Sequence, residues 1–85
     1  MYKIVISKQA LKDLTYLPLK VNIQISKAIE ALASNPRPIG CKKLKGEKEY
    51  VWRIRVGNYR VLYSIDDKIE IVDVRKIGHR KDIYD

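Results

Sequence analysis

The chain has 85 residues, and 18 Lys and Arg against 10 Asp and Glu give it a formal net charge of +8 at pH 7. A domain of this size has one hydrophobic core and buries only about 60% of the surface that its unfolded chain exposes, so a second lobe or a large buried cofactor is excluded. We therefore expect residues 1–85 to form a single domain. The hydrophobic fraction of 46% excludes a wholly disordered basic tail.

No apolar run approaches the ~20 residues that span a bilayer, and the charged start lacks the apolar segment of a signal peptide. We therefore expect a soluble, cytoplasmic protein. Cys41 is the sole cysteine and His79 the sole histidine. These counts exclude an internal disulfide and a cysteine-based zinc site, so we expect no metal and no cofactor. The positive charge predicts attraction to polyanions, which fits nucleic acids and acidic proteins equally.

The first part of the chain predicts a strand followed by two helices. Residues Tyr2–Ile6 alternate and are β-branched, and Ser7 then offers an oxygen that caps a helix reaching Leu17. A second amphipathic helix begins near Leu19, with apolar residues at helical spacing. The expected buried positions of both helices are Ala10, Leu14, Leu17, Val21, Ile25, Ala28, Ile29 and Leu32. Residues 35–40 contain two prolines and predict an ordered loop.

From Lys42 onward the periodicity changes to that of short strands. We expect strands around Leu44 and over residues 50–56, 59–65 and 69–74. Gly57-Asn58 and residues 66–68 provide the turns between the last three. The predicted fold is therefore α+β, with an N-terminal strand and a two-helix hairpin packed on one face of an antiparallel sheet, in the order β-α-α-β-β-β-β.

The Gly57-Asn58 hairpin predicts which side chains of its two strands share a face. Directly opposed residues project to the same side, which pairs Arg55 with Arg60 and places Arg53 beside them. The opposite face is apolar and meets the helices through Trp52, Ile54, Val56, Tyr59, Val61, Tyr63 and Ile65. Like charges so placed repel, and a sequence optimised for stability alone would alternate positive and negative side chains there. The cluster of arginines therefore favours a face that binds phosphate through guanidinium groups. The alternative is a solvated face whose arginine stems cover apolar neighbours.

The last strand leaves its own register open. Ile69 and Ile71 share one parity and residues 72 and 74 the other, so either both sides are buried or a bulge intervenes. After this strand the chain is expected to leave the sheet at Gly78 and to gather basic side chains with His79 and Tyr84. Taken alone, His79 is more often a surface or capping histidine than a catalyst, and Tyr84 more often a packing anchor.

Three segments together resemble the RelE/ParE superfamily of toxins from toxin-antitoxin systems, and most closely its RelE branch. They are residues 43–46, residues 50–63 with the pattern G-x-Y-R-x-x-Y, and residues 78–84 with the pattern G-H-R-x-x-x-Y. The similarity spans essentially the whole chain. It implies a RelE-like fold and a metal-independent endoribonuclease that enters the ribosomal A site. There the ribose 2′-hydroxyl of the mRNA attacks the adjacent phosphate.

The resemblance also implies roles for single residues. Arg60 matches the arginine that stabilises the phosphate in the transition state, and Arg80 the arginine that stabilises charge or donates a proton. Tyr84 matches the tyrosine assigned as general base and stacking group. The residues expected to bind RNA are Lys43, Lys45, Arg53, Arg55 and His79.

Two positions depart from the pattern of the family. Arg53 and Arg55 stand where the best-studied members carry lysines, and because arginine is not deprotonated in proteins, both can supply only electrostatic stabilisation. His79 can then take a larger share of proton transfer. Whether His79 or Tyr84 is the main proton carrier stays open.

The resemblance further implies three partners, which are mRNA, the ribosome and an acidic, amphipathic antitoxin that folds on binding. Two other functions remain open at this point. One is a ParE-like inhibitor of DNA gyrase on the same scaffold, without hydrolytic chemistry. The other is a plain basic binding module, with salt-dependent binding and no cleavage of RNA.

Overall fold

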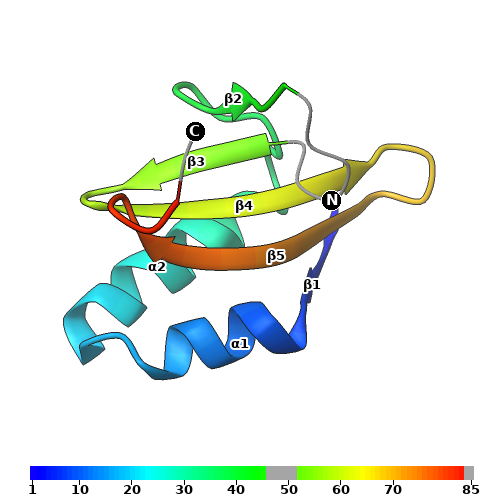
Figure 1. Ribbon diagram of the computed structural model, residues 1–85. Helices are drawn as coiled ribbons and strands as arrows, with labels where there is room; N and C mark the ends of the chain where they lie inside the picture. The colour runs from blue at the N-terminus through cyan, green and yellow to red at the C-terminus, as the bar shows by residue number, and fades with distance from the viewer. Residues whose placement is uncertain (46–51, 84–85) are drawn as a thin grey trace.

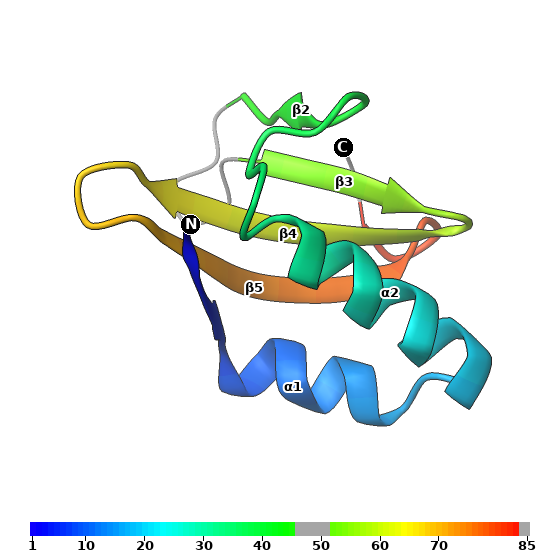
Figure 2. The ribbon, with the colours of Figure 1, turned by 180° about the vertical axis from the view of Figure 1, so that it is seen from behind.

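The structure, a computed structural model, describes residues 1–45 and 52–83 (Figure 1). The helices and strands in chain order are β1 (Lys3–Ile6), α1 (Lys8–Thr15), α2 (Leu19–Ala31), β2 (Lys42–Lys43), β3 (Trp52–Val56), β4 (Tyr59–Asp66) and β5 (Ile71–His79). Both helices lie on the same side of the sheet, as the front and back views agree (Figures 1 and 2). The predicted α+β class and the predicted order of the elements are confirmed.

The sheet of the described residues has five strands in the order β1-β5-β4-β3-β2. Strands β2 to β5 are antiparallel, but β1 runs parallel to β5, with Lys3 opposite Ile71 and Ile6 opposite Val74. The expected antiparallel sheet is confirmed for β2 to β5, whereas β1, for which no partner was predicted, pairs in parallel and makes the sheet mixed. The pattern of a strand reports its burial but not its partner, and the partner of β1 lies at the other end of the chain.

The hydrophobic core lies between the helices and the sheet. Every helix position predicted as buried and every residue of the predicted apolar face belongs to this core or packs against it. The pairing that fixes that face is also confirmed, because Val56 lies opposite Tyr59 and leaves Gly57 and Asn58 as a two-residue loop. Gly57 has a φ of 58°, a conformation that glycine adopts without steric cost and that such tight hairpins require.

Strand β5 contains a bulge, which answers the open question of its register. Val74 lies opposite Tyr63 while Lys76 lies opposite Leu62, so Arg75 is the extra residue. The bulge shifts the alternation by one residue, and Val72, Val74 and Ile77 therefore all reach the core. The strand begins at Ile71 and continues through His79. The expectation that the chain leaves the sheet at Gly78 was thus wrong.

Helix α1 supplies the polar groups that hold the bulge. The Ser7 hydroxyl accepts a hydrogen bond from the Ala10 N–H at 3.1 Å, which confirms it as the N-cap, and donates to the Arg75 carbonyl at 3.0 Å. The Asp13 Oδ2 atom accepts from the Ile77 N–H at 2.9 Å. The backbone groups that the bulge removes from the sheet thereby find partners on the helix.

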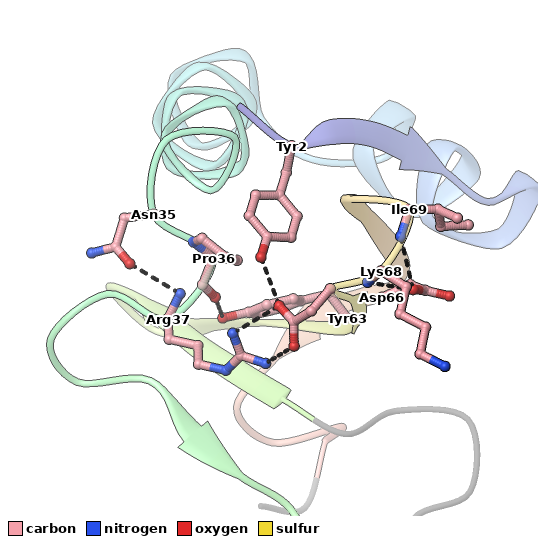
Figure 3. A network of polar contacts seen from close by, with 9 residues as sticks. Tyr2, Asn35, Pro36, Arg37, Tyr63, Asp66, Lys68 and Ile69 are labelled. Atoms are coloured by element: carbon pink, nitrogen blue, oxygen red, sulfur yellow. Dashed lines mark hydrogen bonds and ion pairs between the residues drawn. The ribbon is translucent and has the colours of Figure 1, made fainter.

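A polar network at the far end of the sheet holds the loop of residues 35–40 (Figure 3). The Arg37 guanidinium donates to both carboxylate oxygens of Asp67, at 3.2 and 2.9 Å, and the Tyr2 hydroxyl donates to the same carboxylate at 2.6 Å. Arg37 also stacks 5.0 Å from the ring centroid of Trp52. The buried Tyr63 hydroxyl donates to the Pro36 carbonyl at 2.7 Å. These contacts fix the chain as it passes from α2 to β2.

Candidate nucleic-acid interface

The three arginines predicted to share one face of the sheet do so. Arg55 lies opposite Arg60, and Arg53, two residues before Arg55 on β3, projects to the same side. We call this side, which is opposite to the helices, the arginine face. By register it also carries Lys42 opposite Arg53, Lys76 opposite Leu62, and Gly78 opposite Arg60. Its basic side chains therefore come from four strands.

A second hydrophobic cluster covers part of the arginine face. It consists of Leu44, Leu62 and Ile83, and each of these side chains is buried. Arg53 and Arg60 retain only 3% and 9% of their exposure, whereas Arg55 is exposed. The expectation of an open face holds for Arg55 and was wrong for the other two. The register of the hairpin gives the side on which a residue lies but not its exposure.

The Arg60 guanidinium is held at the hairpin end of the arginine face. Its Nη1 atom donates to the Tyr59 carbonyl at 3.1 Å and approaches the Gly57 carbonyl at 3.5 Å. These contacts restrain the rotamers of the side chain before any ligand arrives. A restrained guanidinium loses less conformational entropy when it binds a phosphate, and its planar fork suits two phosphate oxygens.

The segment after β5 returns to the same region. The Arg80 N–H donates to the Asn58 carbonyl at 2.7 Å, and the Asp82 N–H donates to the His79 carbonyl at 2.8 Å, which closes a turn. Figure 1 shows this segment, in red, curling to the side opposite the helices. Arg80 is exposed beside the hairpin that carries Arg60. The predicted base Tyr84 lies outside the described residues.

His79 does not join the arginine face. It lies opposite Tyr59, whose side chain belongs to the helix side of the sheet, and the two rings meet edge to face with centroids 5.3 Å apart. Its Nδ1 atom accepts a hydrogen bond from the Lys81 N–H at 3.2 Å. The structure thus gives His79 the capping role that its sequence context made the commoner alternative.

The lysines near β2 divide between the two sides of the sheet. Lys43 lies opposite Trp52 and so alternates toward the helix side, while Lys45 is exposed in the turn that follows. Lys42 shares the side of Arg53 and was missed by the sequence analysis. Lys76 was missed as well, because the bulge at Arg75 hid its parity. One signal for Lys42 was available in the sequence. Leu44 lies two residues after Lys42, so the two side chains project to the same side of a strand, opposite to Lys43.

Burial raises the pKa of the Tyr63 hydroxyl, which lies under the sheet on the helix side and stays protonated.

Within residues 1–45 and 52–83, no three His, Cys, Asp or Glu side chains gather to form a metal site. Neither helix in this part of the chain has the length and apolar character that a membrane span requires.

Comparison with known proteins identifies the family. The model of the "ParE toxin of type II toxin-antitoxin system, parDE" matches residues 4–84 of the chain. The chain belongs to the RelE/ParE superfamily of type II toxins. It is closest to the RelE branch of that superfamily, because the RelE1 protein of Methanocaldococcus jannaschii is 40% identical over 88 residues, covering 98% of this chain and 94% of the relative.

Solved structures agree with this placement of the toxin in the RelE branch. The archaeal RelE-RelB complex from Pyrococcus horikoshii is similar with a TM-score of 0.80 and 30% identity, covering 93% of this chain and 94% of the other. The toxin-antitoxin complex RelBE2 from Mycobacterium tuberculosis gives a TM-score of 0.81 and 29% identity, covering 93% and 98%. The chain is thus a RelE-like toxin of a type II toxin-antitoxin system.

Proposed function

We propose that the chain is a metal-independent endoribonuclease that cleaves mRNA in the ribosomal A site. The observation that carries the proposal is the arginine face, where Arg60 is restrained beside the segment that carries Arg80. Fixed cations held at one spot suit a reaction that concentrates negative charge on a phosphate. The match to the RelE branch supports mRNA as the substrate.

The proposed reaction is an internal transesterification. The 2′-oxygen forms a bond to the adjacent phosphorus, the bond from phosphorus to the 5′-oxygen breaks, and the products carry a 2′,3′-cyclic phosphate and a 5′-hydroxyl. A base takes the proton of the 2′-hydroxyl, and the leaving 5′-oxygen gains one. The non-bridging oxygens gain negative charge in the transition state, and the arginines lower its free energy.

We assign roles on the basis of this chemistry. Arg60 contacts the non-bridging oxygens, and Arg80 stabilises the charge that develops on the leaving oxygen. Arg55 binds the RNA backbone next to the scissile phosphate. Tyr84 serves as the general base, which the resemblance of the C-terminal pattern supports. His79 is left out of the assignment because its ring packs on Tyr59, on the helix side of the sheet.

We further propose that a cognate antitoxin binds this chain and blocks its arginine face. The solved relatives include complexes whose titles name a RelE toxin with RelB. An acidic antitoxin segment would satisfy the excess of 18 basic over 10 acidic residues. Binding across a face that contacts RNA would inhibit the enzyme by competition.

Primer extension on cellular mRNA after induction of the toxin tests the proposal. The wild-type chain is expected to produce new 5′ ends in phase with codons, and Arg60→Ala and Arg80→Ala are expected to lose them. Lys27→Ala is the matched control, because it removes one positive charge from α2, on the far side of the sheet. Cuts that persist in both arginine variants would contradict the assignment.

One alternative has a specific observation behind it, since the family model bears the name of ParE. A ParE-like inhibitor of DNA gyrase would cause DNA damage without new RNA 5′ ends. A plain basic module would bind RNA in a salt-dependent way and give neither result. The same induced culture therefore separates the three functions.

A further inference from the structure

The second hydrophobic cluster joins three parts of the chain that are distant in sequence. Leu44 follows β2, Leu62 lies in β4, and Ile83 follows β5. Their side chains are 9%, 5% and 6% exposed, although they lie on the side of the sheet away from the main core. Ile83 is therefore an anchor that holds the C-terminal segment against the arginine face.

Gly78 completes the site on which Ile83 rests. A Cβ atom at this position would lie 3.0 Å from Cδ1 and 3.2 Å from Cγ1 of Ile83, which is closer than such atoms normally approach. The φ of Gly78 does not lie in the left-handed region, so the backbone itself would accept alanine. The glycine is thus required for the space it leaves to Ile83. Its partner across the strand pair is Arg60.

The chain between Gly78 and Ile83 has little conformational freedom. The Arg80 N–H is bonded to the Asn58 carbonyl at 2.7 Å, and the Asp82 N–H to the His79 carbonyl at 2.8 Å. With Ile83 packed on Gly78, both ends of the turn that carries Arg80 are fixed next to the Arg60 hairpin. A displacement of Ile83 would release one of these ends.

We propose that Ile83, seated on Gly78, Leu44 and Leu62, is the positioning residue that holds the Arg80 turn beside Arg60 for RNA cleavage. This inference rests on the proposed function. Because a misplacement of about 1 Å in a catalytic group can lower a rate by about 10²-fold, displacement of Ile83 is expected to lower kcat while leaving KM little changed. Ile83 touches neither RNA nor the reacting atoms and acts through Arg80.

The test uses the full-length toxin with ribosomes and a defined mRNA. Gly78→Ala, whose new methyl group requires Ile83 to shift by a few tenths of an ångström, is expected to lower kcat by about 2- to 10-fold. Ile83→Val removes the Cδ1 atom, the closer of the two contacts, but keeps the Cγ1 atom, so the double variant Gly78→Ala/Ile83→Val is expected to regain part of that loss. Ile69→Ala, at an isoleucine that is 65% exposed, is the matched control and is expected to keep the wild-type kcat.

Two results would overturn the inference. One is a double variant no more active than Gly78→Ala, because relief of the contact is the specific signature of the seat. The other is an Ile83→Ala chain that loses only stability and keeps its kcat per folded molecule. If Ile83→Ala fails to fold, Gly78→Ala and its rescue still decide the matter.

Amide hydrogen exchange tests the seat independently of RNA. Faster exchange of the Arg80 and Asp82 N–H groups in Gly78→Ala, restored in the double variant, is expected if Ile83 holds the turn. Unchanged exchange would contradict the seat. If the variants show the expected exchange pattern but the wild-type chain cleaves no RNA, the proposed function is overturned, and with it only the catalytic part of the inference.

Discussion

The Asp13 carboxylate on α1 accepts a hydrogen bond from the backbone N–H of Ile77 on β5 at 2.9 Å, although 64 residues separate the two. The contact satisfies a donor that the bulge at Arg75 removes from the sheet. The bulge in turn places Lys76 and Gly78 on the arginine face, opposite Leu62 and Arg60. A helix on one side of the sheet thereby helps to set which side chains appear on the other.

Asp13→Ala is expected to lower the free energy of unfolding by about 1–3 kcal/mol, the cost of leaving a partly buried donor without a partner. Asp13→Asn keeps one of the two acceptor oxygens and should lose less. Urea denaturation measures both, with Glu30→Ala on the exposed side of α2 as the control. A loss below about 0.5 kcal/mol in Asp13→Ala, within the range of ordinary surface substitutions, would show that the bulge does not depend on α1.

Because the Tyr63 hydroxyl is buried, we expect the free energy of unfolding to fall at alkaline pH. Burial raises the pKa of its hydroxyl above the usual value, so the folded chain keeps the proton while the unfolded chain ionises above pH ~10. The stability is complete below that pH and falls as the pH rises further. Tyr63→Phe should remove this part of the alkaline slope in urea titrations, whereas Phe at the 77% exposed Tyr16 should leave it unchanged.

Tyr63→Phe should also destabilise the chain at neutral pH by about 1–3 kcal/mol, because the Pro36 carbonyl loses its donor. A Tyr63→Phe chain as stable as wild type at pH 7 would mean that water replaces the hydroxyl. The same urea titration gives this value at its neutral end.

Because the Asp67 carboxylate accepts hydrogen bonds from Arg37 and Tyr2, we expect the free energy of unfolding to fall at acid pH. Hydrogen bonds from Arg37 and then from Tyr2 hold the pKa of its carboxyl below the usual value. The stability that this pair contributes is present above the unfolded pKa of ~3.9 and is lost as the pH falls through the lowered folded value. Asp67→Asn should therefore flatten the acid limb of the stability curve, with Asp82→Asn as the exposed control. An acid limb of equal slope in both variants would exclude a role for the network.

Features of the fold and of the arginine face could be predicted from the sequence where the contacting residues lie close together along the chain. The Gly57-Asn58 hairpin is local, so the side on which Arg53, Arg55 and Arg60 lie was predicted correctly. The bulge was one of two alternatives that the strand pattern left open, since the contacts that decide between them come from α1 and its N-cap. The burial of Arg53 and Arg60 was missed, because the register of a hairpin gives the side of each residue and not what the rest of the chain packs against it.

Arg60→Lys tests whether the shape of the guanidinium matters beyond its charge. Lysine keeps the positive charge but loses the planar fork, so we expect cleavage to fall less than the ~10²–10³-fold loss typical when a transition-state donor is removed altogether by Arg60→Ala. Single-turnover cleavage measures both variants. Arg75→Lys, at the bulge, is the matched control. Equal rates for Arg60→Lys and wild type would show that a point charge is enough.

Arg55 is the exposed arginine of the arginine face, and its contribution to RNA binding should depend on salt. For single-stranded RNA each neutralised phosphate contributes about 0.7 to the slope of log K against log salt concentration. Arg55→Ala should reduce the slope by about that amount, while Lys27→Ala should leave it unchanged. Equal slopes for the two variants would remove Arg55 from the interface.

The chemistry of the cleaved ends tests the central claim most directly. Purified toxin, ribosomes and an mRNA with a known codon in the A site are incubated, and the fragments are analysed by mass spectrometry. We expect one cut in that codon, with a 2′,3′-cyclic phosphate on the upstream fragment and a 5′-hydroxyl on the downstream fragment. Intact mRNA, or fragments with a 3′-hydroxyl and a 5′-phosphate, would contradict it.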